Sequence, residues 1–361
     1  MTSRERFLAA VNHKQPDRAP IDYLASPQAD RAIKDYYGIK TEAELLDIIG
    51  SDFYYLSCRD ISQNESSLPF YRGLCAGVIN DNERVCPFGI KWQRGAYDSK
   101  FAVDDAIESP LKNAQTEKDI LDYQWPKISD FDFSGFNEEI EANKERVIIG
   151  GFWSGILGDC YRMHGFENFL LNIAMNPTMI KTLINRMTDF YLELNNHLFE
   201  QFKGRIDVWF FGNDLGSQAA LLFSPQMLSE FFIPGFKKLA DNAKSYGLKV
   251  MMHSCGAISE IIPLLIEASV DIIDPVQVTA TGMDPQKLKS ELGDKITFHG
   301  GIDTQQLLPY GTPQQVKMEA KRILDIMTPG GGYIYAPSQI LGPDIPAENV
   351  AAMYSVFNTF R

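Results

Sequence analysis

The 361-residue sequence has few cysteines, no long apolar run and no excess of basic residues. Its five cysteines are an odd number without close spacing, so no disulfide framework is indicated and we expect a reduced, cytoplasmic protein. No run approaches the roughly 18 apolar residues that a membrane helix needs, and the amino terminus has no apolar export segment. The sequence therefore predicts neither a membrane protein nor a secreted one.

The sequence also has fewer basic than acidic residues. Lys and Arg total 34 against 47 Asp and Glu, which gives a formal net charge of −13. An acidic chain repels phosphate backbones, and no local basic patch opposes the total, so nucleic acid is not expected as a partner. Gly/Ser linkers, low-complexity tracts and internal repeats are absent as well. With 45% hydrophobic residues, we expect one globular domain over 1–361.

The sequence does contain a regular alternation of short β-branched and aromatic runs with longer segments of helical period. Most runs are apolar on successive residues, as in parallel strands that are covered on both faces. The eight runs span 19–23, 52–57, 147–152, 207–211, 249–253, 271–274, 296–299 and 332–336. Eight strands alternating with helices predict an α/β protein with a (β/α)8 TIM barrel, and a doubly wound open sheet is the alternative.

The segments between the runs carry helix start signals. Asn176, Ser224, Asp284 and Thr312 each place a capping side chain before a proline at the first helical position. Pro234 is expected to kink the helix that follows Ser224.

One segment, 60–145, does not fit a minimal barrel. We expect it to form an excursion after the second strand, with a hairpin from 85–94 and 101–103 followed by a capped helix near Thr116.

In a barrel of this kind the catalytic groups lie at the carboxyl ends of the strands. His253 and Cys255 stand two residues apart at such an end, so their side chains project to the same side, and Gly256 then allows a sharp turn. Imidazole and thiolate at this spacing suit a zinc ion with an open coordination position. The alternative is a buried histidine beside a small apolar cysteine.

Other strand ends carry further polar candidates. Asp214 follows the fourth strand and is a candidate catalytic group, although capping of the next turn is the alternative. His299 ends the seventh strand before two glycines and is a second catalytic candidate, with a structural histidine as its alternative. The candidate substrate-binding residues at these ends are Asp22, Gln218, Asp303 and Ser338.

These motifs together resemble the uroporphyrinogen decarboxylase superfamily, and within it the corrinoid:thiol methyltransferase branch. The similar segments span 4–20, 87–92, 165–169, 213–218, 253–256 (HSCG), 299–303 (HGGID) and 343–349. The resemblance covers nearly the whole chain and implies a (β/α)8 barrel. True uroporphyrinogen decarboxylases have an arginine-rich glycine motif after the first strand, which 23–31 lacks.

The methyltransferase branch binds zinc through a His-x-Cys pair and a later cysteine. His253 and Cys255 match the pair, but the later position falls at Ser338 and Gln339, which include no cysteine. Either Gln339 or Asp214 is then the third metal ligand, or the metal is absent or different. The resemblance also implies methylcobalamin or another methylated corrinoid as methyl donor, and a corrinoid carrier protein as partner.

We therefore expect an enzyme that transfers a methyl group from a methylated corrinoid to a metal-activated thiol. His299 and Asp303 would line its pocket. The first alternative is a decarboxylase of a tetrapyrrole-like or other polycarboxylate substrate, which would need no metal. The second is a non-catalytic corrinoid-binding protein.

Overall fold

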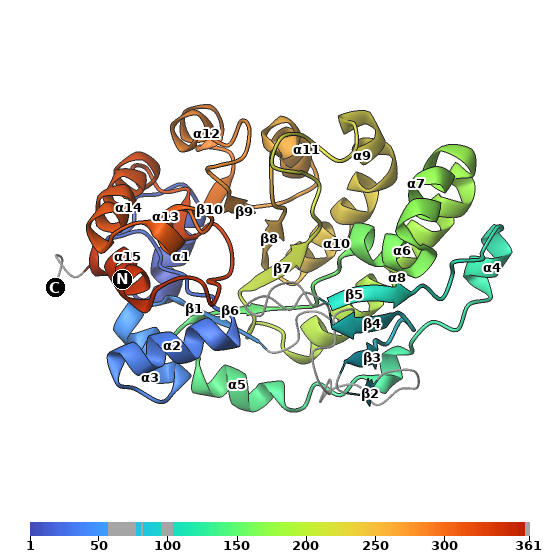
Figure 1. Cartoon of the computed structure of the whole chain (residues 1–361), viewed down its shortest axis with the longest axis horizontal. Helices are drawn as coiled ribbons and strands as arrows, with labels where there is room; N and C mark the ends of the chain where they lie inside the picture. Colours follow the sequence, from blue (N-terminus) through green and yellow to red (C-terminus); the bar gives the residue numbers. More distant parts are fainter. Residues whose placement is uncertain (57–76, 81, 95–103, 358–361) are drawn as a thin grey trace.

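The computed structural model describes residues 1–56, 77–80, 82–94 and 104–357 (Figure 1). Its main feature is a curled sheet of seven parallel strands that follow one another in chain order without reversal. The strands are β1 (Phe53–Tyr55), β6 (Val147–Gly150), β7 (Val208–Gly212), β8 (Lys249–His253), β9 (Ile272–Val276), β10 (Thr297–Ile302) and β11 (Tyr333–Pro337). The predicted α/β class is confirmed, and the order is not that of a doubly wound sheet.

The first of the eight predicted strands, 19–23, does not form a regular strand. Ile21 makes only an isolated parallel bridge to Tyr335 of β11, while its carbonyl accepts the Asp52 N–H at 2.8 Å. The physical reason is a shortage of backbone donors: Pro20 has no N–H, and the Ile21 N–H donates to the Asp52 carboxylate at 2.8 Å. Even so, the backbone of this segment forms hydrogen bonds at both edges of the sheet, with Asp52 just before β1 and with Tyr335 in β11.

Helices follow most of the strands and pack around the sheet (Figure 1). Their bounds are α1 (Ser3–Val11), α2 (Pro27–Tyr37), α3 (Glu42–Ile49), α4 (Glu117–Leu121), α5 (Phe136–Ala142), α6 (Ile156–His164), α7 (Phe166–Met175), α8 (Pro177–Gln201), α9 (Pro225–Phe231), α10 (Ile233–Ser245), α11 (Ile262–Glu267), α12 (Pro285–Leu292), α13 (Leu307–Tyr310), α14 (Pro313–Met327) and α15 (Ala347–Ser355). The interruption between α9 and α10 confirms the break expected at Pro234.

Three of the four predicted helix caps are present. Ser224, Asp284 and Thr312 each accept a backbone N–H in the first turn of α9, α12 and α14. The prediction for Asn176 is wrong, because its side chain makes no cap bond to α8. The Asn176 amide donates instead to the Gln115 carbonyl at 2.9 Å, and so ties α8 to the segment before α4.

A second, antiparallel sheet lies beside α6 (Figure 1). It contains β2 (Gly77–Asn80), β3 (Glu83–Val85), β4 (Lys91–Arg94) and β5 (Asp104–Glu108). The predicted first arm of the hairpin, 85–94, is not one strand, because its two ends lie in β3 and β4, which pair with each other. β4 also pairs with β5, and the predicted second arm, 101–103, lies outside the described residues. The predicted helix cap at Thr116 is confirmed by the capping box of α4.

The interior of the curled sheet is filled by apolar side chains. Phe7 and Val11 of α1 close it at the amino-terminal ends of the strands, and Phe210 lies in the same cluster near a carboxyl end. The cluster contains Phe7, Val11, Phe53, Val147, Ile149, Val208, Phe210, Met251, Ile272 and Ile334. Because this core fills the interior, a ligand has access only to the layer above it, at the carboxyl ends.

Candidate metal centre and pocket

A pocket of about 320 Å³ lies at the carboxyl ends of the strands. Its size is at the lower end of the range of about 300–1,000 Å³ that is usual for small-molecule sites. The described residues that line it are Asp22, Leu24, Tyr55, Trp153, Phe210, His253, Asp274, His299, Ala336, Pro337, Gln339 and Ile340. The pocket therefore collects side chains from nearly every strand end, as the alternation in the sequence predicts.

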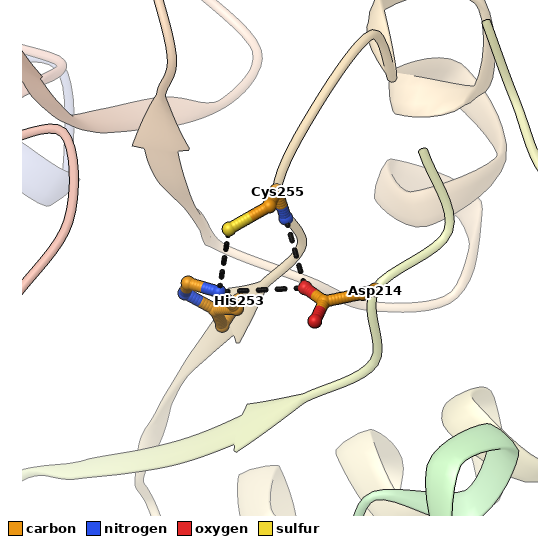
Figure 2. Close-up of side chains that lie close together, drawn as sticks. All are labelled: Asp214, His253 and Cys255. Carbon is orange, nitrogen blue, oxygen red and sulfur yellow. Dashed lines mark hydrogen bonds and ion pairs between the residues drawn. The ribbon is translucent and has the colours of Figure 1, made fainter. Parts of the chain in front are cut away.

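His253, Cys255 and Asp214 meet beside this pocket, and Figure 2 shows all three pointing toward one another. His253 Nε2 lies 3.1 Å from Cys255 Sγ and 3.5 Å from Asp214 Oδ1. The Cys255 N–H donates to the Asp214 carboxylate at 3.1 Å. The predicted His253–Cys255 pair therefore projects to one side, and the loop after β7 brings Asp214 against it.

The turn after Cys255 depends on Gly256. Its φ is +90°, and a Cβ at this position would lie 2.5 Å from the Ser217 carbonyl oxygen. Only glycine combines this backbone conformation with such a close approach. The predicted sharp turn is confirmed, and it brings the segment after Cys255 against the loop that carries Asp214.

Asp274 of β9 orients the metal-binding histidine candidate. The register pairs Asp274 with His253 of β8, and the His253 Nδ1–H donates to Asp274 Oδ2 at 2.5 Å. The other oxygen, Oδ1, accepts from His299 Nδ1 at 2.6 Å. A carboxylate on Nδ1 fixes the imidazole so that Nε2 faces Cys255 and Asp214, which is the usual arrangement behind a metal-binding histidine.

The same line of hydrogen bonds continues to the segment before β1. His299 Nε2 donates to Asp22 Oδ2 at 2.9 Å, and the Tyr55 hydroxyl donates to that oxygen at 2.5 Å. His299 lies at an irregularity in the pairing of β10 with β9, a feature that often redirects a side chain near functional sites. Asp22, His299, Asp274 and His253 thus form one buried row of alternating carboxylates and imidazoles.

The charges in this row raise the pKa of both imidazoles. Burial lowers the pKa of His299, but Asp274 and Asp22 more than offset this and raise it to about 9. Burial also lowers the pKa of His253, but Cys255, Asp274 and Asp214 together outweigh burial and raise this pKa well above its ordinary value. Burial raises the pKa of Asp274, but the two imidazoles lower it well below its usual range.

The donor set fits a zinc ion. The ligand atoms of His253, Cys255 and Asp214 all lie within 4.8 Å of one another and supply nitrogen, sulfur and oxygen, the three donor types that zinc accepts. Three protein ligands leave a fourth position for another group, as in catalytic zinc sites. The Nδ1 bond to Asp274 leaves Nε2 as the ligand atom of His253.

The remaining predicted site residues have varied surroundings. The Gln339 amide donates to Cys255 Sγ at 3.0 Å, so Gln339 lies beside His253, Cys255 and Asp214, the candidate metal-ligand group. Gln218 lies in a second layer, where it accepts from Gln277, whose Oε1 in turn accepts the Gly256 N–H.

Asp303 and Ser338 are not among the described lining residues of the pocket. The Asp303 carboxylate accepts the backbone N–H groups of Gln305, Gln306 and Leu307. The Ser338 hydroxyl donates to the Val276 carbonyl at 2.9 Å. Substrate contact by either side chain stays a prediction.

Sequence reasoning missed the aromatic side of the pocket. Trp153 follows β6, Phe210 is within β7, and Tyr55 ends β1. Their rings contact one another, with centroids of Trp153 and Phe210 5.3 Å apart and those of Tyr55 and Phe210 6.0 Å apart. Their position near the ends of predicted strands was the only feature of the sequence that could have indicated a pocket. This feature is weak, because aromatic residues at strand ends also pack in cores.

Within the described part of the chain, no helix has the length and apolar character needed to cross a membrane.

Comparisons with known proteins support the resemblance. A uroporphyrinogen decarboxylase of Magnetococcus marinus is 21% identical over 98% of this chain and 96% of its own length. A methylated-thiol–coenzyme M methyltransferase of Methanosarcina mazei is 25% identical over 42% of this chain and 38% of that protein. The solved structure of a methyltransferase from Methanosarcina mazei has a TM-score of 0.70 at 16% identity, over 100% of this chain and 99% of that one, and thus shares the fold.

The model of the uroporphyrinogen decarboxylase (URO-D) family matches residues 135–360, which include β6 to β11 and the whole metal-ligand group. The chain belongs to the uroporphyrinogen decarboxylase family.

Proposed function

We propose that this chain is a methyltransferase that moves a methyl group from a methylated corrinoid to a thiol acceptor, with zinc as its metal. In this proposal a partner protein carries the corrinoid. His253, Cys255 and Asp214 hold the metal, and Asp214 takes the place of the second cysteine of the branch that the sequence resembles. The methylated-thiol–coenzyme M methyltransferase among the relatives supports the reaction class.

The observation that carries the proposal is the meeting of three unlike metal ligands beside a pocket. A histidine, a cysteine and a carboxylate lie within 4.8 Å of one another, and His253 is itself a lining residue. When bound, zinc supplies Lewis-acid chemistry that lowers the pKa of an acceptor thiol, so that the nucleophilic thiolate forms near neutral pH.

The chain's own residues prepare the site for this chemistry. Asp274 holds the Nδ1–H of His253, so that Nε2 faces the ligand group and can coordinate a metal ion once it has lost its proton. Asp214 stays 62% exposed and is held by the Cys255 N–H, so its carboxylate can reorient without unfolding a core element. Trp153 and Phe210 cover the side of the pocket next to His253 and limit the access of water.

The absence of a second cysteine predicts a weaker zinc site. Near Cys255 the chain offers the Gln339 amide, a neutral group, where the resembling branch has a thiolate. We therefore expect zinc that is present but exchangeable. Mild chelation should remove it without unfolding the protein, because the apolar core does not depend on it.

The test combines metal analysis with turnover. Protein purified without added metal is dialysed against micromolar zinc, its zinc content is measured, and thiol methylation by methylcobalamin is followed. His253→Ala and Cys255→Ser should each abolish both zinc retention and methylation. His197→Ala, which changes an exposed histidine on α8, is the matched control and should retain both. Wild-type protein that retains no zinc would overturn the proposal.

The decarboxylase alternative has an observation of its own, the Magnetococcus marinus relative that spans nearly the whole chain. A polycarboxylate substrate needs cationic partners, and the lining residues in the described part of the chain include no Lys or Arg. Consumption of uroporphyrinogen by the metal-free protein would establish this alternative. Cobalamin binding without zinc or turnover would establish instead the non-catalytic corrinoid-binding protein.

A further inference from the structure

The walls of the pocket point to the chemical class of the acceptor. We propose that the thiol acceptor is a small uncharged molecule with an apolar tail, and that the pocket disfavours an anionic thiol. This inference rests on the proposed function and names the substrate class of the same site.

The first observation is an apolar wall next to the metal-ligand group. The Trp153 ring lies 5.3 Å from the His253 ring and 5.3 Å from the Phe210 ring, measured between centroids. Tyr55 extends this wall from Phe210, and Leu24 and Ile340 line the same pocket. A thiol sulfur placed at the metal-ligand group therefore has its tail against aromatic and aliphatic carbon.

The second observation is that the polar lining groups are engaged with one another. Asp22 accepts from His299 and Tyr55, and Asp274 accepts from His299 and His253, at distances of 2.5–2.9 Å. A charged tail would leave water and meet groups whose hydrogen bonds are already made. Such a transfer is unfavourable, whereas an apolar tail gains from it.

The third observation concerns cations. The nearby guanidinium of Arg162 lies 3.5 Å from the Asp159 carboxylate and stacks over the Trp92 and Tyr161 rings at 5.3 and 5.2 Å. Arg162 is not among the described lining residues.

In the neighbouring pocket, which also contains Leu24 and Tyr55, Lys34 is paired with Asp30 at 2.6 Å. The described lining residues of the main pocket include no Lys or Arg, and His299 and His253 already donate to Asp22 and Asp274, so an anionic tail would find no unpaired cation there. A cationic tail would also lose its hydration against the apolar wall, and the lining carboxylates of Asp22 and Asp274 already accept hydrogen bonds from His299 and His253.

The experiment uses three small thiols, of which the uncharged and the anionic one have nearly the same shape. In 3-methylbutane-1-thiol an isopropyl group replaces the carboxylate of 3-mercaptopropionate, and 3-aminopropane-1-thiol provides the cation. The kcat/KM for methylation by methylcobalamin is measured for each with the zinc-loaded protein. Tryptophan fluorescence quenching, with Trp153 in the pocket wall, reports binding without turnover.

We expect the uncharged thiol to exceed both charged thiols by about tenfold or more in kcat/KM and in binding. Equal or better use of 3-mercaptopropionate, or of 3-aminopropane-1-thiol, would overturn the inference. If no thiol is methylated, the proposed function fails, and the fluorescence titration still decides the preference because it requires binding alone.

A single substitution at the rim should reverse the preference. Ile340 lines the pocket and is 44% exposed, so Ile340→Lys adds a cation without burying it in the core. Ile340→Lys should improve the use of 3-mercaptopropionate relative to the uncharged thiol by about tenfold, and Ile340→Met, the uncharged control, should not. An unchanged ratio in Ile340→Lys would contradict the placement of the thiol tail in this pocket.

Discussion

Replacing Asp274 by Asn removes the carboxylate that two buried imidazoles share. Asp274 accepts from His253 at 2.5 Å and from His299 at 2.6 Å, and it is only 8% exposed. An asparagine of nearly the same shape has one oxygen acceptor in place of two and no charge. One of the two imidazoles must therefore face an amide N–H in place of an acceptor.

Two effects of different size follow. Breaking a buried charged pair costs about 3–5 kcal/mol, so we expect the free energy of unfolding of metal-free Asp274→Asn to fall by about 3 kcal/mol. Loss of the partner behind a metal-binding histidine typically weakens metal binding by about 10–100-fold. Urea unfolding in the presence of a chelator measures the first effect, and zinc competition against a chromophoric chelator measures the second.

Asp303→Asn is the matched control. Asp303 is a similarly buried carboxylate at the next strand end, but it accepts only backbone N–H groups. It should lose about 1 kcal/mol of stability and no zinc affinity. If Asp274→Asn binds zinc as tightly as the wild type, or if Asp303→Asn loses as much affinity, the orienting role of Asp274 is refuted.

Two further predictions concern His299 and Asp214. The pKa of His299 is about 9 in the folded protein against about 6.5 in an unfolded chain, so its stabilisation is complete below pH 6.5 and is lost as the pH rises through 9. Urea unfolding of the metal-free protein should show the stability difference between wild type and His299→Gln shrinking by about 3 kcal/mol over this window, and a constant difference would contradict it. Asp214→Asn should weaken zinc binding and methylation while the melting temperature stays near that of the wild type, because the carboxylate is exposed. A destabilised but fully active Asp214→Asn would place this residue in turn capping.

The sequence predicted the fold where local patterns suffice. The caps of α9, α12 and α14 are an example, because Ser224, Asp284 and Thr312 each stand before a proline and each accept a backbone N–H of the first turn. The prediction of a first strand at 19–23 was wrong for a reason that hydrophobic periodicity cannot reveal. The run 19–23 is apolar enough for a strand, but Pro20 lacks a donor and the Asp52 side chain takes the Ile21 N–H.

The candidate site was predictable only in its local part. The His253–Cys255 pair follows from a two-residue spacing, which the geometry of an extended chain converts directly into a shared side. The role of Asp274 depends on the register between β8 and β9, and its second contact, with His299, crosses 25 positions of sequence. No pattern within one segment encodes such lateral contacts, so the row from Asp22 to His253 emerged only from the folded structure.

The most direct test of the account is X-ray absorption at the zinc edge on the zinc-loaded protein. Ligation by His253, Cys255 and Asp214 predicts a single sulfur neighbour at about 2.3 Å, with nitrogen and oxygen neighbours in the remaining positions. Cys255→Ser should lose that sulfur, and addition of the thiol acceptor to the wild type should add a second one. A zinc ion with no sulfur neighbour, or a spectrum that Cys255→Ser leaves unchanged, would contradict the proposed metal centre.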